Sequence, residues 1–387
     1  MYELGPEETA LVIGPASVVL CNGSAEIVGA LLKTGQRVII RSGKLLPIEA
    51  TERVDLDIRL GQGASIEKIL GSSIPQSWRI AAEDILASKM SIVMNLGGID
   101  SGKSTLATFI ANRAVRAGTT VQMIDADLGQ SELGPPGSIA HCQVTRPTTD
   151  LFRLNPQSMY FVGDTSPSCV AEDVIKGIRT ILDGVRQLPG MKIINTDGWI
   201  DGEAARDFKT ELACVVAPDI ICALEAQTEL DNVIEALEAH RMRVRRLEVP
   251  TVVKKRDREH RRDLREQVYR KFIGNATIRT LQFDWVKVED RFYGTTSGLE
   301  SGDILLRLRG FEGLLVGLAD EEGKFLGVGL LKNIEKGRRV ARIRTPVREA
   351  IRRMKLGRIR LDEYGRELEI LRDESRSSTT EIEPNSR

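Results

Sequence analysis

The sequence predicts an α/β fold in which a mostly parallel sheet is flanked by β-rich domains at both ends of the chain. In the middle of the chain, apolar strand-like runs alternate with helical patterns, which favours a parallel sheet covered on both faces. The first ~88 residues carry short β-type runs separated by glycine, asparagine and lysine turns, and β-type runs return after Gly274. We therefore expect a β-rich domain over 1–88, an α/β domain over 89–274, a β-rich domain over 275–372 and a disordered polar tail over 373–387.

Charge is segregated along the chain. The 387 residues include 55 Lys or Arg and 55 Asp or Glu, and a net charge of zero first argues against a nucleic-acid partner. However, residues 241–271 hold 13 basic and 5 acidic residues, and residues 332–360 hold 12 basic and 2 acidic residues. The second block has almost no acids of its own to pair with. We therefore expect both blocks to contribute to a nucleic-acid groove and not to be a solvated surface of salt bridges.

Several function classes are disfavoured by composition. No apolar run reaches the ~18 residues of a membrane span, and the first residues carry acids where a secretory signal carries bases. These features predict a cytoplasmic protein with no membrane partner. The five cysteines form no CxxC pair and the three histidines have no ligand-like spacing, so a zinc site or a histidine-based mechanism is not expected.

A glycine-rich loop follows the first strand of the α/β region. Residues 97–105 fit the pattern G-x-x-x-x-G-K-[ST], with an apolar strand (91–96) before it and a helical run (103–116) after it. Backbone N–H groups of such a loop surround phosphate oxygens, and the helix adds its positive end. Lys103 is expected to reach the β- and γ-phosphates, and Ser104 to bind Mg²⁺. The pattern predicts a P-loop NTPase domain whose nucleotide site comprises Gly97, Gly98, Ile99, Asp100, Ser101, Gly102, Lys103, Ser104 and Thr105.

Two carboxylates follow the next predicted strand. Asp125 and Asp127 stand at its end, which brings them next to the glycine-rich loop. An acid in this place can hold Mg²⁺ through water or accept a proton from a nucleophile. We expect Asp125 and Asp127 to belong to the metal site, and Asp127 to be the general base, because histidine is scarce. The alternative is a solvated acidic turn. A guanine-reading [NT]KxD motif is absent from the sequence, which weakens a GTPase interpretation.

Four motifs in order resemble one known family. They are the glycine-rich loop at 97–105, the segment D-A-D-L-G-Q at 125–130 followed by P-P-G, the turn G-D-T-S-P at 163–167 and the segment N-T-D-G-W at 195–199. Together they resemble the polynucleotide 5′-hydroxyl kinase family, which includes archaeal RNA kinases and the kinase subunits of pre-mRNA 3′-end and tRNA splicing complexes. The resemblance extends over essentially the whole chain. It implies an ATP- and Mg²⁺-dependent kinase that phosphorylates the 5′-hydroxyl end of RNA, with DNA as an open second substrate.

The resemblance also implies roles for particular residues. Lys103 and Ser104 match the phosphate-binding lysine and the Mg²⁺-binding hydroxyl, and Asp127 matches the Walker B aspartate that activates the 5′-hydroxyl. Thr196 lies in the TxGW element that the family uses as a clasp beside the phosphate lysine. Trp199 of the same element is either a stacking surface for a base or a packing residue, and both interpretations stay open.

A basic segment near residue 260 matches the lid of the family. A guanidinium there can stabilise the charge that spreads over the γ-phosphoryl oxygens during transfer. The alternative is an exposed basic helix with ion pairs one turn apart. We predict Arg256 and Arg261 to be the catalytic lid residues, and the other candidates in the segment are Arg258, Arg262 and Arg265.

Two other functions remain in competition with the kinase. One is an ATP-bound, non-catalytic scaffold subunit of an RNA-processing complex, and the other is a P-loop NTPase switch that acts on a protein. The sequence identifies no protein partner and does not give the oligomeric state. Intact Lys103, Asp127 and Arg256 favour the kinase.

Overall fold

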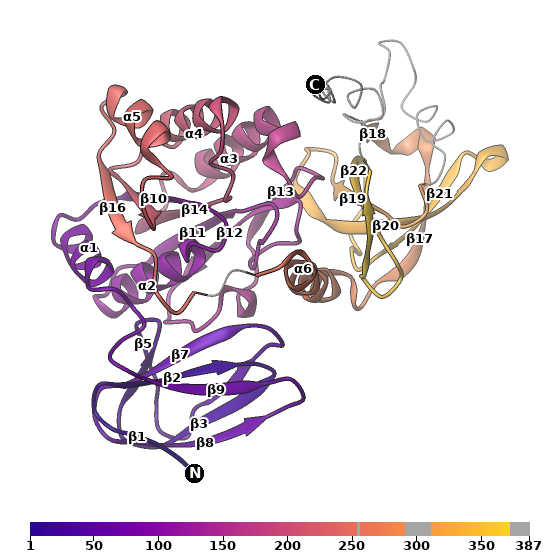
Figure 1. Cartoon of the computed structure of the whole chain (residues 1–387). Coiled ribbons are helices and arrows are strands. Elements are labelled where there is room, and N and C mark those ends of the chain that lie inside the picture. The colour runs from indigo at the N-terminus through magenta and orange to yellow at the C-terminus, as the bar shows by residue number, and fades with distance from the viewer. Residues whose placement is uncertain (254–255, 291–310, 372–387) are drawn as a thin grey trace, which may run out of the picture. The chain divides into compact units, whose positions relative to one another are not determined.

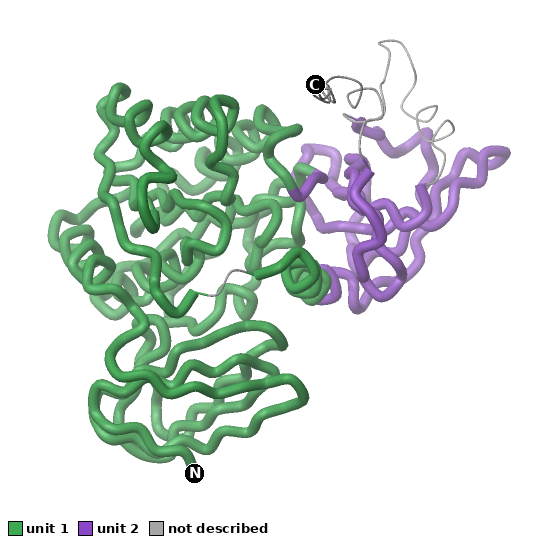
Figure 2. The backbone as a smooth tube through the Cα atoms, viewed as in Figure 1, with its two compact units in different colours: residues 1–162, 166–268 green, residues 163–165, 269–387 purple. Residues whose placement is uncertain are grey.

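The computed structural model describes residues 1–253, 256–290 and 311–371. The chain divides into two compact units (Figure 2). The first comprises residues 1–162 and 166–268, and the second comprises residues 163–165 and those from 269 onward. The predicted tail at 373–387 lies outside the described residues. The predicted domain limits stay predictions, although the first 88 residues and most of the α/β region, up to residue 268 except 163–165, belong to one unit.

The N-terminal part of the first unit consists of two antiparallel sheets (Figure 1). Its strands alternate between inward and outward side chains; in the strand over 16–22, Ala16, Val18 and Leu20 are buried and the residues between them are not. This period of two is typical of a half-buried strand. In strand order the sheets are β1 (Tyr2–Leu4), β8 (Val54–Leu60), β3 (Ala16–Asn22) and β6 (Arg37–Ile40), and β5 (Ala30–Leu31), β4 (Ala25–Ile27), β7 (Leu45–Ala50), β2 (Glu8–Ile13) and β9 (Ser65–Leu70).

The rest of the first unit is built on a seven-stranded sheet. Five neighbouring strands run parallel. Two further strands extend one edge, and each of them is antiparallel to its neighbour on the inner side. The four inner parallel strands are buried almost from end to end, because helices cover both faces of the sheet, whereas the outermost strand, over 244–248, buries only Leu247. The predicted mostly parallel sheet is therefore confirmed. Its order is β13 (Ser158–Phe161), β12 (Ser138–Val144), β11 (Val121–Ala126), β14 (Met191–Thr196), β10 (Ile92–Gly97), β15 (Ile220–Glu225) and β16 (Val244–Glu248).

Helices cover the two faces of this sheet in separate layers (Figure 1). Two helices, α1 and α2, pack together on one face, and α3, α4 and α5 pack in sequence on the other. The apolar residues of α3 recur every three or four positions, as in Val174, Ile178 and Leu182, and are buried. None of the helices in the described part of the chain is long and apolar enough to cross a membrane. The helices are α1 (Gln76–Ala87), α2 (Lys103–Arg116), α3 (Ala171–Val185), α4 (Glu203–Val216), α5 (Asp231–Ala239) and α6 (Arg258–Ile273).

The two parts of the first unit share one hydrophobic core. Buried residues of the N-terminal strands and of α1, α2 and the central sheet form a single cluster. Asn112 of α2 is completely buried at this junction. Its amide nitrogen donates to the carbonyl oxygens of Val28 and Thr148, each at 2.8 Å, and its amide oxygen accepts from the backbone N–H of Thr148 at 2.8 Å. One side chain therefore connects a turn of the N-terminal part to α2 and to the segment after β12.

The second unit contains an antiparallel sheet with one parallel edge pair. Residues 314–319 and 325–335 form a hairpin, pairing as antiparallel strands around a turn near 320–323. The division between the units falls within α6. In order, the strands are β17 (Thr277–Gln282), β21 (Val340–Thr345), β20 (Phe325–Glu335), β19 (Leu314–Ala319), β22 (Arg353–Leu361) and β18 (Lys287–Glu289), with β23 (Glu367–Ile370) paired to β22.

The basic block at 332–360 does not lack acidic partners, so that part of the prediction was wrong. Neighbouring strands and turns supply acids, most of which lie outside the block and some of which are far away in the sequence. Arg358 is buried and pairs with Asp164 of the G-D-T-S-P turn at 3.1 Å. Other pairs join Arg339 to Asp284, Arg342 to Glu335, Arg353 to Glu289 and Arg360 to Glu369.

We predict that Asn112→Ala destabilises the first unit by about 3 kcal/mol, because three buried backbone groups lose their hydrogen-bond partner. The measurement is the urea midpoint of the transition followed by near-ultraviolet circular dichroism. The control is Asn333→Ala, which removes an exposed amide from β20 and should leave the midpoint nearly unchanged. An unchanged midpoint for Asn112→Ala would mean that water replaces the three lost bonds.

Candidate active site

The predicted site residues meet at one edge of the central sheet. The parallel strands β10, β11 and β14 are neighbours, and their carboxyl ends carry the glycine-rich loop, the acidic pair and the N-T-D-G-W segment. In open α/β sheets, ligands bind outside the carboxyl ends of the strands. Motifs that lie about 30 and 100 residues apart in sequence are thus brought to a single place.

The loop between β10 and α2 has the backbone of a phosphate-binding loop. Gly97 has a φ of 158° and Gly102 a φ of 99°, and α2 begins directly afterwards at Lys103. A Cβ atom on Gly97 would lie 2.6 Å from the hydroxyl oxygen of Ser101 and 2.8 Å from a carbonyl oxygen of β15, so only glycine fits. The loop therefore turns tightly over the end of the sheet.

The Lys103 side chain folds back over the loop. Its ammonium donates to the carbonyl oxygen of Gly98 at 2.6 Å. Burial lowers the pKa of this ammonium to about 8, while the carboxylates of Asp127, Asp197 and Asp100 oppose that shift. The lysine is thus held at the loop together with a set of carboxylates, where an incoming phosphate would add further negative charge.

Asp127 is held by the turn that follows β11. One carboxylate oxygen accepts from the backbone N–H groups of Gly129 at 3.0 Å and Gln130 at 2.9 Å. Burial raises the pKa of the carboxyl to about 6; the charge of Lys103 opposes this shift and the charge of Asp125 adds to it. A carboxylate with a raised pKa accepts a proton more readily than an exposed one does.

Asp125, unlike Asp127, accepts hydrogen bonds from the protein through both of its carboxylate oxygens. It is buried, and one oxygen accepts from Ser131 and from the N–H groups of Glu132 and Leu133. Its other oxygen accepts from the amide nitrogen of Asn195 at 3.0 Å, and that same nitrogen donates to the Ser104 hydroxyl at 3.1 Å. The Asp125 oxygens are thus committed to the protein itself, and its predicted place as a metal ligand stays a prediction.

Asn195 was not among the predicted site residues. It belongs to the same motif as Thr196, and its signal in the sequence was a polar residue at the end of an otherwise apolar strand. The Thr196 hydroxyl donates to the carbonyl oxygen of Asn95 at 2.8 Å, whereas Lys103 donates to Gly98. The two side chains are therefore bonded to separate backbone groups, and the catalytic role of Thr196 stays a prediction.

The turn after Thr196 packs directly on the glycine-rich loop. A Cβ atom on Gly198 would lie 2.7 Å from the backbone nitrogen of Ile99. Asp197 accepts from the N–H of Trp199 at 2.8 Å and pairs with the completely buried ammonium of Lys209 at 2.7 Å. Trp199 stacks on Phe208 of α4, with ring centroids 5.6 Å apart, so packing accounts for at least one face of its ring.

Both predicted lid arginines lie at the glycine-rich loop. The guanidinium groups of Arg256 and Arg261 are each 3.5 Å from a carboxylate oxygen of Asp100. Among the other candidates, Arg262 pairs with Glu266 on its own helix at 3.3 Å. The structure therefore brings Arg256 and Arg261 to the loop, while their catalytic role stays a prediction.

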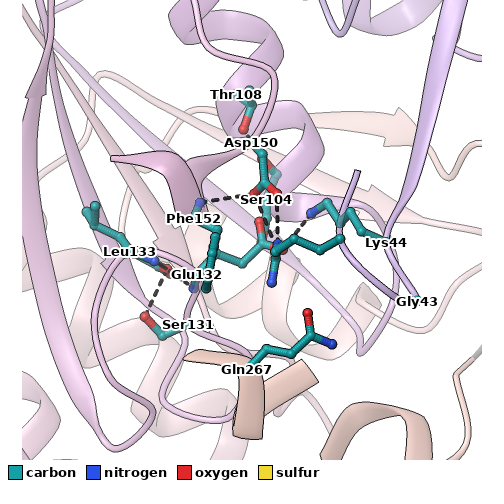
Figure 3. Close-up of polar contacts among 12 residues, drawn as sticks. Gly43, Lys44, Ser104, Thr108, Ser131, Glu132, Leu133, Asp150, Phe152 and Gln267 are labelled. Atoms are coloured by element: carbon teal, nitrogen blue, oxygen red, sulfur yellow. Dashed lines mark hydrogen bonds and ion pairs between the residues drawn. The ribbon is translucent and has the colours of Figure 1, made fainter. Parts of the chain in front are cut away.

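A cluster of charges behind the acidic turn was missing from the predicted site (Figure 3). Glu132 is 2.5 Å from Lys44 and 3.0 Å from Arg41, and Arg41 also pairs with Asp150 at 2.9 Å. Burial alone would raise the pKa of Glu132, but the charges of Lys44 and Arg41 lower it to about 2. Nothing in the local sequence around Arg41 or Lys44 marks them as partners of residues about 90 positions away.

The site fits a divalent cation that takes only some of its ligands from the protein and the others from phosphate oxygens and water. Three oxygens around the loop are buried without a hydrogen-bond partner: the Ser101 hydroxyl and the amide oxygens of Asn95 and Asn195. Within the described ranges, no group of three or more His, Cys, Asp or Glu side chains could hold a metal. Mg²⁺ is commonly bound by one or two protein groups together with phosphate oxygens and water. Ser104 and Asp127 are among the side chains that the sequence predicts for this role, and the role stays a prediction.

Fold and site together define a P-loop protein that binds a nucleoside triphosphate. The family described as "mRNA cleavage and polyadenylation factor CLP1 P-loop" matches residues 97–275. The polyribonucleotide 5′-hydroxyl-kinase of Methanocaldococcus jannaschii is 30% identical, covering 72% of this chain and 89% of the relative. That of Thermococcus kodakarensis is 31% identical, covering 72% and 91%. The chain belongs to this polyribonucleotide 5′-hydroxyl-kinase family.

A solved structure supports the fold. Clp1p, in a structure that describes its interface with Pcf11p, superposes with a TM-score of 0.71 at 16% identity, and the match covers 93% of this chain and 98% of Clp1p. The P-loop domain and both β-rich flanks are thus features of the family fold.

We predict that Asp127→Asn stabilises the nucleotide-free protein at neutral pH. The folded pKa of about 6 lies above the ordinary value of 3.8. The folded state therefore keeps its proton longer than the unfolded chain does, and wild-type stability falls as pH rises from about 4 to 6. At pH 7.5 we expect a gain of about 1–2 kcal/mol for the half-buried carboxyl, and this gain should shrink towards zero below pH 4.

The measurement is urea unfolding of both proteins at pH 7.5, 5 and 4. Asp201→Asn, which neutralises an exposed carboxylate in the segment between β14 and α4, should show no such pH-dependent difference. A stability loss for Asp127→Asn at pH 7.5 would contradict the raised pKa.

Proposed function

We propose that the protein is an ATP-dependent kinase that transfers the γ-phosphoryl group to the 5′-hydroxyl end of RNA. The observation that carries the proposal is the joint placement of Lys103, Asp127 and two arginines around one phosphate-binding loop. A site for nucleotide binding alone needs the loop and the lysine. The carboxylate with its raised pKa and the pair of guanidinium groups add the two functions that transfer requires, which are activation of a hydroxyl and stabilisation of charge.

Each side chain would act on a different part of the reaction. The loop N–H groups and the Lys103 ammonium would bind the β- and γ-phosphates. Asp127, whose turn fixes one of its oxygens, would orient the RNA hydroxyl with the other and take its proton as the new bond forms. Arg256 and Arg261 would stabilise the charge on the γ-phosphoryl oxygens.

Magnesium would be held by Ser104 and Asp127. Asp125 would help to position Ser104, because both side chains accept from the amide nitrogen of Asn195. When bound, Mg²⁺ neutralises charge on the β- and γ-phosphates and polarises the transferred group. Asn195 keeps the Ser104 hydroxyl in place and leaves its own amide oxygen available. This arrangement explains why a buried amide lies between a hydroxyl and a carboxylate at the end of the sheet.

Named relatives support the choice of substrate, since the curated archaeal proteins to which the chain is similar are polyribonucleotide 5′-hydroxyl-kinases. A second candidate is an ATP-bound scaffold, because a fold relative, Clp1p, was solved with a protein, Pcf11p. The intact set of Lys103, Asp127, Arg256 and Arg261 favours the kinase. A cytoplasmic location and use of DNA ends remain predictions.

We predict that the protein transfers label from γ-labelled ATP to a 5′-hydroxyl oligoribonucleotide. Lys103→Ala should abolish transfer and weaken ATP binding, because the phosphates lose their ammonium partner. Asp127→Asn should lower kcat by about 10²–10⁴-fold, because the base is lost, and should weaken ATP binding less than Lys103→Ala does, because the loop N–H groups and the lysine still bind the phosphates. RNA and DNA ends are assayed side by side, and ATP binding is measured by calorimetry.

The control substrate is the same oligonucleotide with a 5′-phosphate, which cannot accept a further phosphoryl group on a hydroxyl at that end. If a folded protein binds ATP but transfers no label to RNA or DNA, the kinase proposal fails and the scaffold is favoured. If hydrolysis is stimulated by a protein and is indifferent to nucleic-acid ends, the switch is favoured.

We predict that exposed arginines of the second unit bind RNA phosphates. Changing Arg338, Arg348 and Arg352 to Gln should weaken RNA binding and reduce the slope of log K against log salt by up to about 2, since each single-strand phosphate contact contributes about 0.7. Three exposed arginines in the N-terminal sheets, Arg37, Arg53 and Arg59, provide a control of equal charge change. Equal effects of the two triple variants would remove the basic block from the RNA site.

A further inference from the structure

Asp100 is an acidic residue inside a loop that binds anions. It lies between Gly97 and Lys103 and its side chain is only 6% exposed. A carboxylate in this position repels the phosphates that the loop is built to hold. The negative charge of Asp100 is not needed to bind the triphosphate or to deprotonate the hydroxyl. We therefore look for its role in the contacts that Asp100 makes within the protein.

Those partners are the two lid arginines. The backbone N–H of Arg256 donates to one Asp100 oxygen at 3.0 Å, and the guanidinium of Arg256 lies 3.5 Å from the other. The Arg261 guanidinium lies 3.5 Å from Asp100 and donates to the carbonyl oxygen of Arg256 at 3.0 Å. One carboxylate thus holds the start of the lid by its backbone and by both of its functional side chains.

A second contact connects the lid to the turn of the general base. The side-chain amide of Gln130 donates to the carbonyl oxygen of Arg261 at 3.4 Å, and the backbone N–H of the same residue donates to Asp127. The lid segment therefore touches both the phosphate loop and the acidic turn. The helix α6 also contacts the N-terminal sheets, where a ring nitrogen of His260 lies 3.2 Å from the carbonyl oxygen of Gly43, so Asp100 is the contact that acts on the two arginines themselves.

We propose that Asp100 is a positioning residue that holds Arg256 and Arg261 at the phosphate loop before the triphosphate arrives and yields them to the γ-phosphoryl group during transfer. The proposal rests on the kinase function proposed above. The two ion pairs are long, at 3.5 Å, and both guanidinium groups are about 30% exposed. Pairs of this kind are weak, whereas phosphate oxygens can offer shorter, bidentate bonds to arginine. The guanidinium groups can therefore exchange Asp100 for phosphate oxygens, while the backbone N–H of Arg256 stays bonded to the buried carboxylate.

The backbone of Asp100 limits which residues can take this role. Its φ is 57°, in the left-handed region that Asn and Asp adopt more readily than other side chains do. Asp100→Asn therefore keeps the loop conformation and an acceptor for the Arg256 N–H, and removes only the charge. This makes it the informative substitution.

The test is a mutant cycle on the full chain. Asp100→Asn is combined with wild-type arginines and with the double variant Arg256→Gln/Arg261→Gln, and kcat and KM for ATP are measured for each. With wild-type arginines we expect kcat to fall about 10-fold while KM for ATP stays the same or falls, because a repulsive charge has left the loop. In the double variant we expect Asp100→Asn to have no further effect on kcat.

A matched control uses Arg262→Gln, on the same helix but paired with Glu266. Its effect should add to that of Asp100→Asn, because the two do not share a partner. Equal loss of kcat in the presence and absence of Arg256 and Arg261 would overturn the proposal. A rise in KM with unchanged kcat would also overturn it, since that result would make Asp100 a simple loop residue.

A readout independent of catalysis separates this proposal from the kinase function. In the nucleotide-free protein, hydrogen exchange over residues 256–266 should be faster in Asp100→Asn than in wild type, and the thermal midpoint should be nearly unchanged. Faster exchange in a protein that phosphorylates no nucleic-acid end would refute the kinase function and retain the Asp100 contact. Unchanged exchange would refute the contact even in an active kinase.

Discussion

The buried carboxylate of Asp125 is the interaction on which the site geometry depends. It ends a central strand, accepts from three groups of the following turn, and accepts from the amide of Asn195 on the neighbouring strand. That amide in turn holds the hydroxyl at the start of α2. A carboxylate without these donors would be costly at this depth. The residues that surround the phosphates are thus kept in register by a group that need not touch a ligand.

Much of the fold could be predicted because it rests on local patterns. The segments that form β10, α2 and β11 have clear apolar periods. The glycine-rich loop joins β10 to α2, and its glycines permit the backbone conformation that the loop adopts. The strand β12, next to the edge of the sheet, was missed, because Ser138, His141 and Gln143 interrupt its apolar pattern. His141 is buried there only because Gln122 and Ser158 bond to its ring. The burial of such a strand depends on hydrogen-bond partners that lie outside any short window of the sequence.

The same reason limits prediction of the site. Lys103, Ser104 and Asp127 follow from motif spacing, and the structure brings Arg256 and Arg261 to the loop as the family resemblance implies. Asn195, Lys209 and Glu132 were missed, since each acts through a residue distant in sequence. Counting charges within a window failed in the second unit for this reason too, because Arg358 finds its acid at Asp164. Composition locates charge along a chain, but only the fold says which charges remain available.

The ion pairs of Glu132 indicate a structural role for the N-terminal sheets. Arg41 and Lys44 stand on a turn of those sheets, yet they neutralise Glu132 and Asp150 of the α/β region. A chain shortened to begin at α1 would keep two poorly hydrated carboxylates and lose both cations. It would also expose the apolar surface of α1 and α2 that the sheets cover. We therefore expect the smallest piece that folds on its own to include the N-terminal sheets, which share a core and ion pairs with the P-loop domain.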